Sequence, residues 1–134
     1  MLKLSDIDFK AVVLGALVDN LGTMFAISLL ILALSSTGLS EDGVAERLKT
    51  PSGELLVLII GMGWTTTGGY AAGRMAKRSE LLHGSMVAVI GILLALIFRD
   101  PGRPHWAEIA GFIAMLPVGI FGGYLARQRN NRTT

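Results

Sequence analysis

The sequence has no cysteine. Disulfide bonds, thiolate metal sites and a cysteine nucleophile are therefore excluded. Only two histidines are present, His83 and His105, and an apolar stretch long enough to cross a membrane separates them. They cannot share a metal ion, and His83 is expected at a membrane interface. We expect no metal and no cofactor.

Charge is also scarce. Only 16% of the 134 residues are charged, whereas about 25% is typical of a soluble domain. The charged residues gather in short patches between long apolar stretches, as in a multi-pass membrane protein whose loops hold the charge. The net charge of +2 does not indicate nucleic-acid binding, because the basic residues flank apolar stretches and form no soluble basic face. They are better explained as topology determinants and contacts with anionic lipids.

Four apolar stretches are predicted to cross a bilayer as helices. Each fits the length that a membrane helix needs, about 17 to 25 residues, and they cover residues 11–34, 55–76, 81–98 and 106–126. The predicted fold is an all-α integral membrane protein with four transmembrane helices, forming a single membrane domain over residues 1–134. A short amphipathic helix is expected at residues 40–48, where Ser40 is a good N-cap.

Lysine and arginine are distributed unequally between the two sides of this arrangement. Four of them fall on one side, in the first and third connections: Arg47, Lys49, Arg99 and Arg103. The other eight fall in the two terminal tails and the second connection: Lys3, Lys10, Arg74, Lys77, Arg78, Arg127, Arg129 and Arg132. The positive-inside rule therefore predicts that both termini are cytoplasmic. Five of these side chains are expected at the lipid headgroups: Arg74, Lys77, Arg78, Arg127 and Arg129.

The sequence contains a possible internal repeat. Gly68–Ala72 (GGYAA) recurs 54 positions later as Gly122–Ala126 (GGYLA). Residues 14–16 also align loosely with residues 83–85, at an offset of 69. An even number of spans separates the copies, so a duplication would relate two parallel halves in a 2+2 arrangement. The alternative is chance similarity between membrane helices that are rich in glycine and alanine.

Glycine is abundant, with 17 residues, and many of them lie within the predicted spans. In lipid, small residues let helices approach closely, and Gly69-x-x-x-Gly73 has the spacing of such a contact. The glycines assigned to helix packing are Gly15, Gly22, Gly68, Gly69, Gly73, Gly122 and Gly123. They either pack the helices of one bundle or form a dimerisation face or the wall of a conduit.

Asp19 is the residue that most needs an explanation. It lies near the middle of the first span, and no lysine or arginine shares that span. A carboxylate at such a depth costs about 2.5 kcal/mol or more, so it is a candidate functional site by default. Counting about 1.5 Å per residue from the charged ends of the spans places Thr65, Gly91 and Val118 at the same depth.

The predicted intramembrane polar site contains Asp19, Asn20, Trp64, Thr65 and Thr66. Because helical spacing puts Gly15, Asp19 and Gly22 on one face, Asp19 is expected to point into the bundle. Three roles remain open. Asp19 is a protonated acid that bonds to Asn20 or to a threonine hydroxyl, or it lines a wet cavity and binds a proton or cation. In the third role it meets a group of another subunit.

The segment GGYAAGRMAKRSELLHG, residues 68–84, resembles small bacterial four-helix membrane proteins that carry a GGYxAGR segment. The resemblance is close over this segment and loose over residues 15–94, and it implies a bacterial inner (plasma) membrane protein without implying an activity. The architecture is also similar to that of small multidrug-resistance transporters, which have one acidic residue in the first of four spans. This chain lacks their aromatic-rich lining, since only Trp64 lies deep among polar residues.

No arrangement typical of an enzyme is present. Ser35, Ser36 and Ser40 have no histidine or lysine base nearby in sequence, and the glycines near Trp64 lack the lysine of a phosphate loop. The leading hypothesis is a non-enzymatic membrane protein that acts by assembly, as a homo-oligomer or as an accessory subunit of a larger membrane complex. Its expected partners are the lipid bilayer and a membrane protein. The alternative is a small proton- or cation-coupled transporter that uses Asp19.

Overall fold

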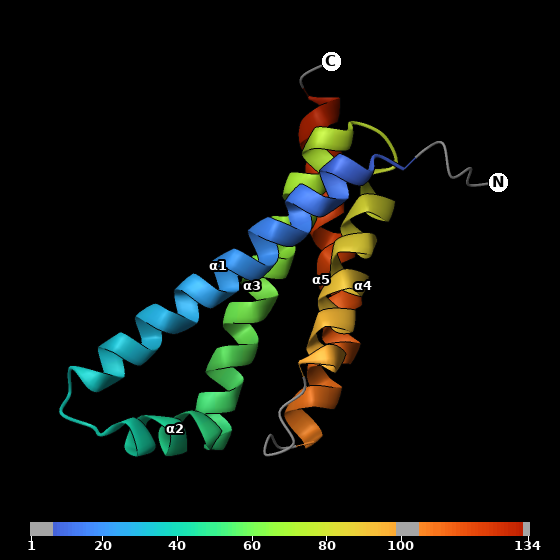
Figure 1. Cartoon of the computed structure of the whole chain (residues 1–134). Coiled ribbons are helices and arrows are strands. Elements are labelled where there is room, and N and C mark those ends of the chain that lie inside the picture. Colours follow the sequence, from blue (N-terminus) through green and yellow to red (C-terminus); the bar gives the residue numbers. More distant parts are fainter. Residues whose placement is uncertain (1–6, 99–104, 133–134) are drawn as a thin grey trace.

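The protein is described by a computed structural model that covers residues 7–98 and 105–132, and within these ranges it contains helices and no strand (Figure 1). The elements are α1 (Phe9–Ser35), α2 (Glu41–Lys49), α3 (Pro51–Ala76), α4 (Glu80–Ile97) and α5 (His105–Asn131). Four of them, all but α2, are long and apolar enough to cross a membrane. The prediction of an all-helical protein with four membrane-length helices is therefore confirmed.

Side-chain caps fix where the first three helices begin. The carboxylate of Asp8 accepts hydrogen bonds from two backbone amides in the first turn of α1. Ser40 accepts from the amide of Gly43 and caps α2, as predicted, so the short helix covers residues 41–49. Thr50 caps α3, and Pro51 occupies its first turn, where a missing N–H does no harm. This cap explains why α3 begins at residue 51, whereas the predicted span began at residue 55.

The last helix is longer than predicted. It runs to Asn131 rather than to residue 126 and continues through Pro117. Its extra turn is held by Asn130, which donates hydrogen bonds to the carbonyl of Gly73 and to the carboxylate of Glu80. These bonds tie the end of α5 to the end of α3 and the start of α4, so the helix extends past the apolar span.

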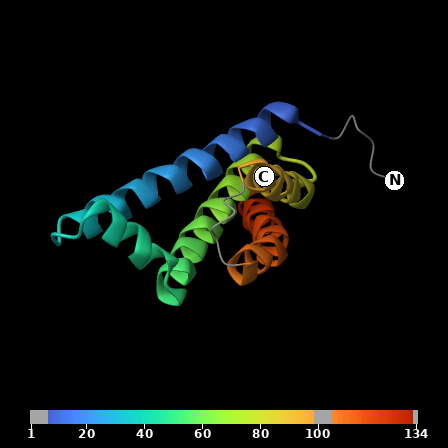
Figure 2. The ribbon, with the colours of Figure 1, turned by 60° about the horizontal axis from the view of Figure 1, so that its bottom comes forward.

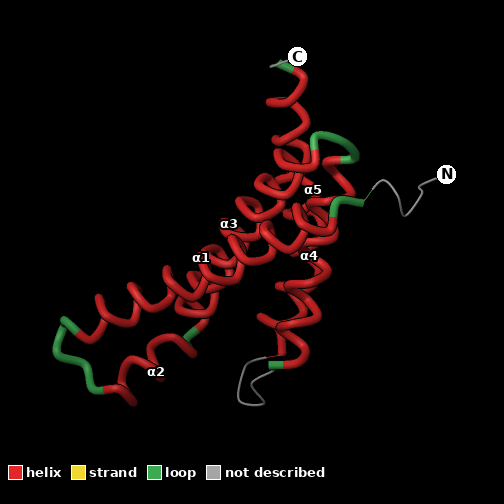
Figure 3. Tube along the Cα trace, turned by 45° about the horizontal axis from the view of Figure 1, so that its top comes forward, coloured by secondary structure: helices red, strands yellow, loops and turns green. Residues whose placement is uncertain are grey.

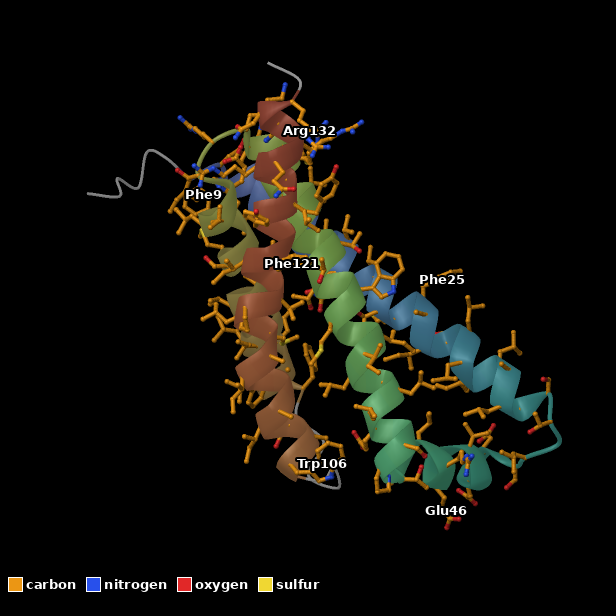
Figure 4. All side chains as sticks on the ribbon, turned by 180° about the vertical axis from the view of Figure 1, so that it is seen from behind. Phe9, Phe25, Glu46, Trp106, Phe121 and Arg132 are labelled. Carbon is orange, nitrogen blue, oxygen red and sulfur yellow. The ribbon has the colours of Figure 1, made fainter. Side chains whose placement is uncertain are left out.

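The four long helices run alternately up and down. Phe9 and Arg132 lie at one end of the molecule, called here the terminal end, while Glu46 and Trp106 lie at the opposite end (Figure 4). The connection from α3 to α4 is also at the terminal end, and it is short because Lys77 and Ser79 both adopt the left-handed conformation (Figure 3). Helix α3 is central, in contact with α1, α4 and α5, whereas α1 makes no contact with α5 among the described residues.

Towards the terminal end the helices pack through glycine. On eight glycines of this region a Cβ atom would lie within 3 Å of a backbone or Cβ atom of a neighbouring helix: Gly15, Gly68, Gly69, Gly73, Gly84, Gly119, Gly122 and Gly123. Any larger residue would push the backbones apart, so these positions set the spacing of the helices. Seven glycines were assigned to packing from the sequence, and six of them are in this group. The seventh, Gly22, lies against the ring of Trp64.

Towards the opposite end, α1 leaves the bundle. Figures 1 and 2 show it diverging from α3 until the two are joined again through α2. Gly22 still contacts the ring of Trp64 on α3. Beyond it many apolar side chains of α1 are exposed, among them Phe25, 63% accessible, and Leu32, 66% accessible. This part of α1 can therefore meet lipid or another protein.

Candidate functional site

Asp19 is buried where α1 and α3 approach most closely. Gly15 and Gly68 bring the two backbones together, and a Cβ on Gly68 would lie 2.8 Å from the Cβ of Asp19. The carboxylate is only 3% exposed, and its Oδ1 accepts a hydrogen bond of 3.1 Å from the hydroxyl of Thr65, which is itself fully buried. The structure thus brings together two of the predicted site residues.

The second carboxylate oxygen of Asp19, Oδ2, faces α4. A Cβ on Gly91 would lie 3.4 Å from this oxygen and 3.2 Å from the terminal methyl of Met115 on α5. No described residue donates a hydrogen bond to Oδ2. Every fully buried side-chain oxygen of the described residues has a hydrogen-bond partner, so Oδ2 keeps a small accessible surface.

A cavity of about 260 Å³ lies between the four long helices. It begins one helical turn from the level of the acid, at Thr23 of α1, Gly61 of α3 and Ala95 of α4, and it extends towards the opposite end. Most of its wall is apolar, with side chains that include Ile27, Val57, Leu58, Met62, Phe112 and Met115. Asp19 is not one of its lining residues, and the nearest one on the same helix is Thr23.

Few charged groups lie in this region. Among the described residues, Glu108 near the start of α5 is the one ionisable residue that lines the cavity. Asp19 is a second acid, one helical turn beyond Thr23. Among the described residues, no group of three or more acids, histidines or cysteines could hold a metal ion.

The other three predicted site residues do not reach Asp19. The amide of Asn20 donates to the carbonyl of Ala16 in its own helix, so Asn20 is not the partner of the acid. The hydroxyl of Thr66 likewise donates to a carbonyl of its own helix, one turn earlier. Trp64 packs its ring against Gly22. These residues support the helices around the site and leave Thr65 as the one polar neighbour bonded to the acid.

The basic residues assigned to lipid headgroups lie at the terminal end. Arg74 is partly buried, and its guanidinium donates a hydrogen bond of 2.6 Å to Asn130. The other four are exposed: Lys77, Arg78, Arg127 and Arg129. Arg74 thus belongs to the network that joins α3, α4 and α5, while headgroup contact stays a prediction for all five.

His83 was expected at an interface, but it is completely buried. Its Nδ1 lies 2.9 Å from the carbonyl oxygen of Ser79, and its Nε2 lies 2.9 Å from the backbone nitrogen of Asp8. A carbonyl can only accept and an N–H can only donate, so the ring is neutral, with its proton on Nδ1. The start of α1 covers the ring, which the position of His83 in the sequence did not reveal.

Counting depth along the sequence identified the residue beside Asp19 on α4 but not the one on α5. Depth counting pointed to Gly91, which does lie beside the acid. On α5 the same counting pointed to Val118, whereas the residue that reaches the site is Met115, almost one turn nearer the opposite end. Counting residues gives depth but ignores how helices tilt and how far a long side chain reaches.

Comparisons with models of known protein families, with curated proteins and with solved structures give no match. The resemblance to small bacterial proteins with a GGYxAGR segment therefore stays a prediction. The functional argument rests on the geometry of the helices and of the cavity.

Proposed function

We propose that this protein acts by assembly within the membrane and not as an enzyme, either as a homo-oligomer or as an accessory subunit of a larger membrane complex. The contact would be made by the outward face of α3, the face turned away from the other helices. The observation that carries this proposal is an unpacked glycine, Gly63, in the middle of α3.

Gly63 is exposed, and a Cβ built on it meets no atom within 4 Å. One turn further along, Thr67 is also exposed, and its hydroxyl donates to the carbonyl of Gly63 at 2.8 Å. Gly63 and Thr67 form a small-x-x-x-small pair on a face that no helix of the described chain covers. Because the hydroxyl is already bonded, the pair presents a shallow, satisfied surface to the membrane.

The packed glycines of the same protein show what such a surface does. Eight of them lie at contacts between helices, where the backbones approach too closely for any side chain. A glycine inside a helix is disfavoured by about 0.5–1 kcal/mol relative to alanine, so it needs a compensating contact. At Gly63 no described residue makes that contact, and a helix from a second copy or from another membrane protein would supply it.

The absence of cysteine allows a direct test. A single cysteine at position 63 should be cross-linked across the interface in native membranes, while one at Val89, an exposed position of α4, should not. A product of twice the monomer mass indicates a homodimer, and one of another mass indicates a partner subunit. A solitary monomer in mild detergent, with no product from either variant, would contradict assembly.

We further propose the inner membrane of a bacterium as the setting, with both termini in the cytoplasm. Support comes from the sequence, which has eight lysines and arginines in the two terminal tails and the second connection against four in the first and third connections. A membrane-impermeant maleimide added to intact spheroplasts should label a cysteine at Ser36 but not one at Arg132. The reverse labelling would invert the orientation.

A second candidate function is a small proton- or cation-coupled carrier. It is favoured by the Oδ2 atom of Asp19, which accepts no hydrogen bond from any described residue although Asp19 is only 3% exposed. The measurement is proton flux or cation efflux in vesicles, comparing the parent chain with Asp19→Asn. Equal flux in the two would exclude Asp19 as the coupling residue.

A further inference from the structure

We propose that a groove between α4 and α5 at the terminal end is a discrete binding site for one anionic phospholipid. The phosphate would lie against Arg127 of α5, and an acyl chain would follow the groove towards the middle of the two helices. The inference needs only the membrane setting of these helices, so it depends neither on assembly nor on transport.

The groove has a volume of about 600 Å³. Its wall is formed by the start of α4, where Ser79 to Leu82 and Ser85 line it, and by Ile120 and Arg127 of α5. Both helices are long and apolar enough to cross a membrane. Because Ser79 directly precedes α4 and Arg127 lies near the end of α5, the groove begins where the headgroups of a bilayer would meet these helices.

Arg127 supplies the positive charge of the groove. Its side chain is exposed, and it forms no hydrogen bond or ion pair with any described residue. Arg74, Arg78 and Arg129 at the same end each take part in an interaction within the protein. A guanidinium binds a phosphate through two parallel N–H···O bonds, and basic pockets between membrane helices bind anionic headgroups. Arg127 is therefore available to the phosphate of a lipid.

One acidic residue, Glu80, also lines the groove. Only 8% of Glu80 is exposed, and its Oε1 accepts a hydrogen bond of 2.9 Å from the amide of Asn130. Its carboxylate thus belongs to the network that joins α3, α4 and α5. Since Arg127 is exposed and Glu80 is buried, the charge that the described residues present to a ligand in the groove is positive.

The groove changes from polar to apolar along its length. Ser79 and Arg127 lie at its terminal end, and Leu82 and Ile120 form part of the wall deeper in the span. Ile120 is seven residues from Arg127, which corresponds to about 10 Å along the helix axis. The hydroxyl of Ser85 donates to a carbonyl of its own helix. A phospholipid has the same order of parts, a charged headgroup followed by a hydrocarbon chain.

The apolar part of the wall favours a lipid over a soluble anion. A soluble phosphate ester would contact Arg127 alone, and a single exposed ion pair contributes little to binding. A phospholipid also packs its chain against Leu82 and Ile120, while the bilayer holds its phosphate at the level of the basic residues. We therefore expect the two ends of the groove to act together.

The test is native mass spectrometry of the full chain, released from detergent micelles after a lipid is added. Phosphatidylglycerol is the anionic probe, and phosphatidylcholine with the same acyl chains is the matched lipid without net charge. The parent should bind one phosphatidylglycerol per chain, about tenfold more tightly than phosphatidylcholine, as expected for a charged hydrogen bond. Glycerophosphoglycerol, the same headgroup without acyl chains, should bind far more weakly than either lipid.

Two matched variants separate a discrete site from general attraction to basic residues. Arg127→Gln should weaken the binding of phosphatidylglycerol about tenfold and leave that of phosphatidylcholine unchanged. Its control, Arg132→Gln, removes the same charge five residues further along the chain, at an exposed residue that does not line the groove. This control should bind both lipids like the parent.

The outcomes also separate this inference from the assembly proposal. Equal binding of the two lipids by the parent, or equal effects of the two arginine variants, overturns the site. Binding of glycerophosphoglycerol as tight as that of phosphatidylglycerol also overturns it, in favour of a site for a soluble phosphate ester. None of these results bears on the contact at Gly63, which the cross-linking test addresses, so either proposal can fail without the other.

Discussion

The α1–α3 pair and the α4–α5 pair are built around the same contact. A Cβ on Gly68 of α3 would meet the carbonyl oxygen of Gly15 and the side chain of Asp19 on α1. A Cβ on Gly119 of α5 would meet the carbonyl oxygen of Gly84 and the side chain of Ala88 on α4. In each pair the second of these residues follows the first glycine by one turn. Asp19 and Ala88 therefore occupy equivalent places.

The difference between the two pairs shows that Asp19 is not required for packing. Ala88 fills the same place in the α4–α5 pair and is completely buried. A buried methyl group satisfies the contact without any polar partner, whereas a carboxylate at this depth needs one. The acid in the α1–α3 pair therefore calls for a chemical explanation, of which the hydrogen bond from Thr65 is one part.

The same equivalence supports the predicted duplication into two parallel halves. Gly15 and Gly84 are 69 positions apart, as are Asp19 and Ala88, which matches the offset found for the first and third spans. Gly68 and Gly119 are 51 positions apart, whereas the GGY segments repeat at 54. If the halves are related, α5 has slipped against α4 by nearly one turn.

The largest effect is expected where a side chain breaks the contact itself. Gly84→Val would place a methyl-bearing carbon against the carbonyl oxygen of Gly119 and 2.9 Å from the backbone nitrogen of Gly123. Backbone atoms cannot turn aside, so the free energy of unfolding should fall by about 3 kcal/mol. Unfolding in mixed SDS micelles measures the change. Gly63→Val, which adds the same bulk where nothing is packed, should leave stability close to the parent.

The second-largest effect tests whether the surroundings of positions 19 and 88 differ, and not only the residues that occupy them. Ala88→Asp would put a second acid at the equivalent depth, where the residue of α5 that corresponds to Thr65 by the contact register is Leu116. Without a hydroxyl partner, the variant should lose about 2.5 kcal/mol of stability. Ala88→Ser is the control for size. Parent-like stability of Ala88→Asp would show that the α4–α5 pair can also hold an acid.

A somewhat smaller effect is expected at His83. At the offset of 69 its counterpart is Leu14, which is exposed, so His83→Leu would make the two pairs more alike. The variant removes the acceptor for the amide of Asp8 and the donor for the carbonyl of Ser79, at a cost of about 2 kcal/mol. Hydrogen exchange should rise most at the start of α1. Uniform exchange along α1 would argue against a local role.

The smallest effect is expected from Asp19→Asn. The side-chain oxygen of asparagine can still accept the hydrogen bond of Thr65, so the free energy of unfolding should change by less than about 1 kcal/mol. A large loss of stability would mean that the carboxylate itself is needed for folding, contrary to the comparison with Ala88.

Hydropathy and spacing were sufficient to predict the fold class. Four membrane-length helices and the short helix capped by Ser40 follow from apolar runs and capping chemistry, which act locally. Thr65 and Gly91 were found by depth because helices that cross a membrane share a common axis direction. Local rules were enough wherever the answer depended on one helix or on depth alone.

The remaining features depend on how helices cross. The sequence placed Asn20 beside Asp19, but neighbours on a helix point in different directions, and Asn20 bonds to its own backbone. Nothing local marked Asn130 as the residue that joins Arg74 to Glu80, or the start of α1 as the cover of His83. These contacts join residues far apart in sequence, and one sequence does not contain their geometry.

Helix α1 also has a mechanical property. It is fixed near the terminal end by the Asp8–His83 bond and by the crossing of Gly15 with Gly68, and towards its other end it diverges from α3 until α2 joins the two (Figures 1 and 2). From Gly15 to Ser35 the helix is about 30 Å long, so a swing of about 10° moves its far end by about 5 Å. Thr23 and Ile27 form part of the cavity wall. The angle of α1 would therefore set the width of the cavity between the four long helices.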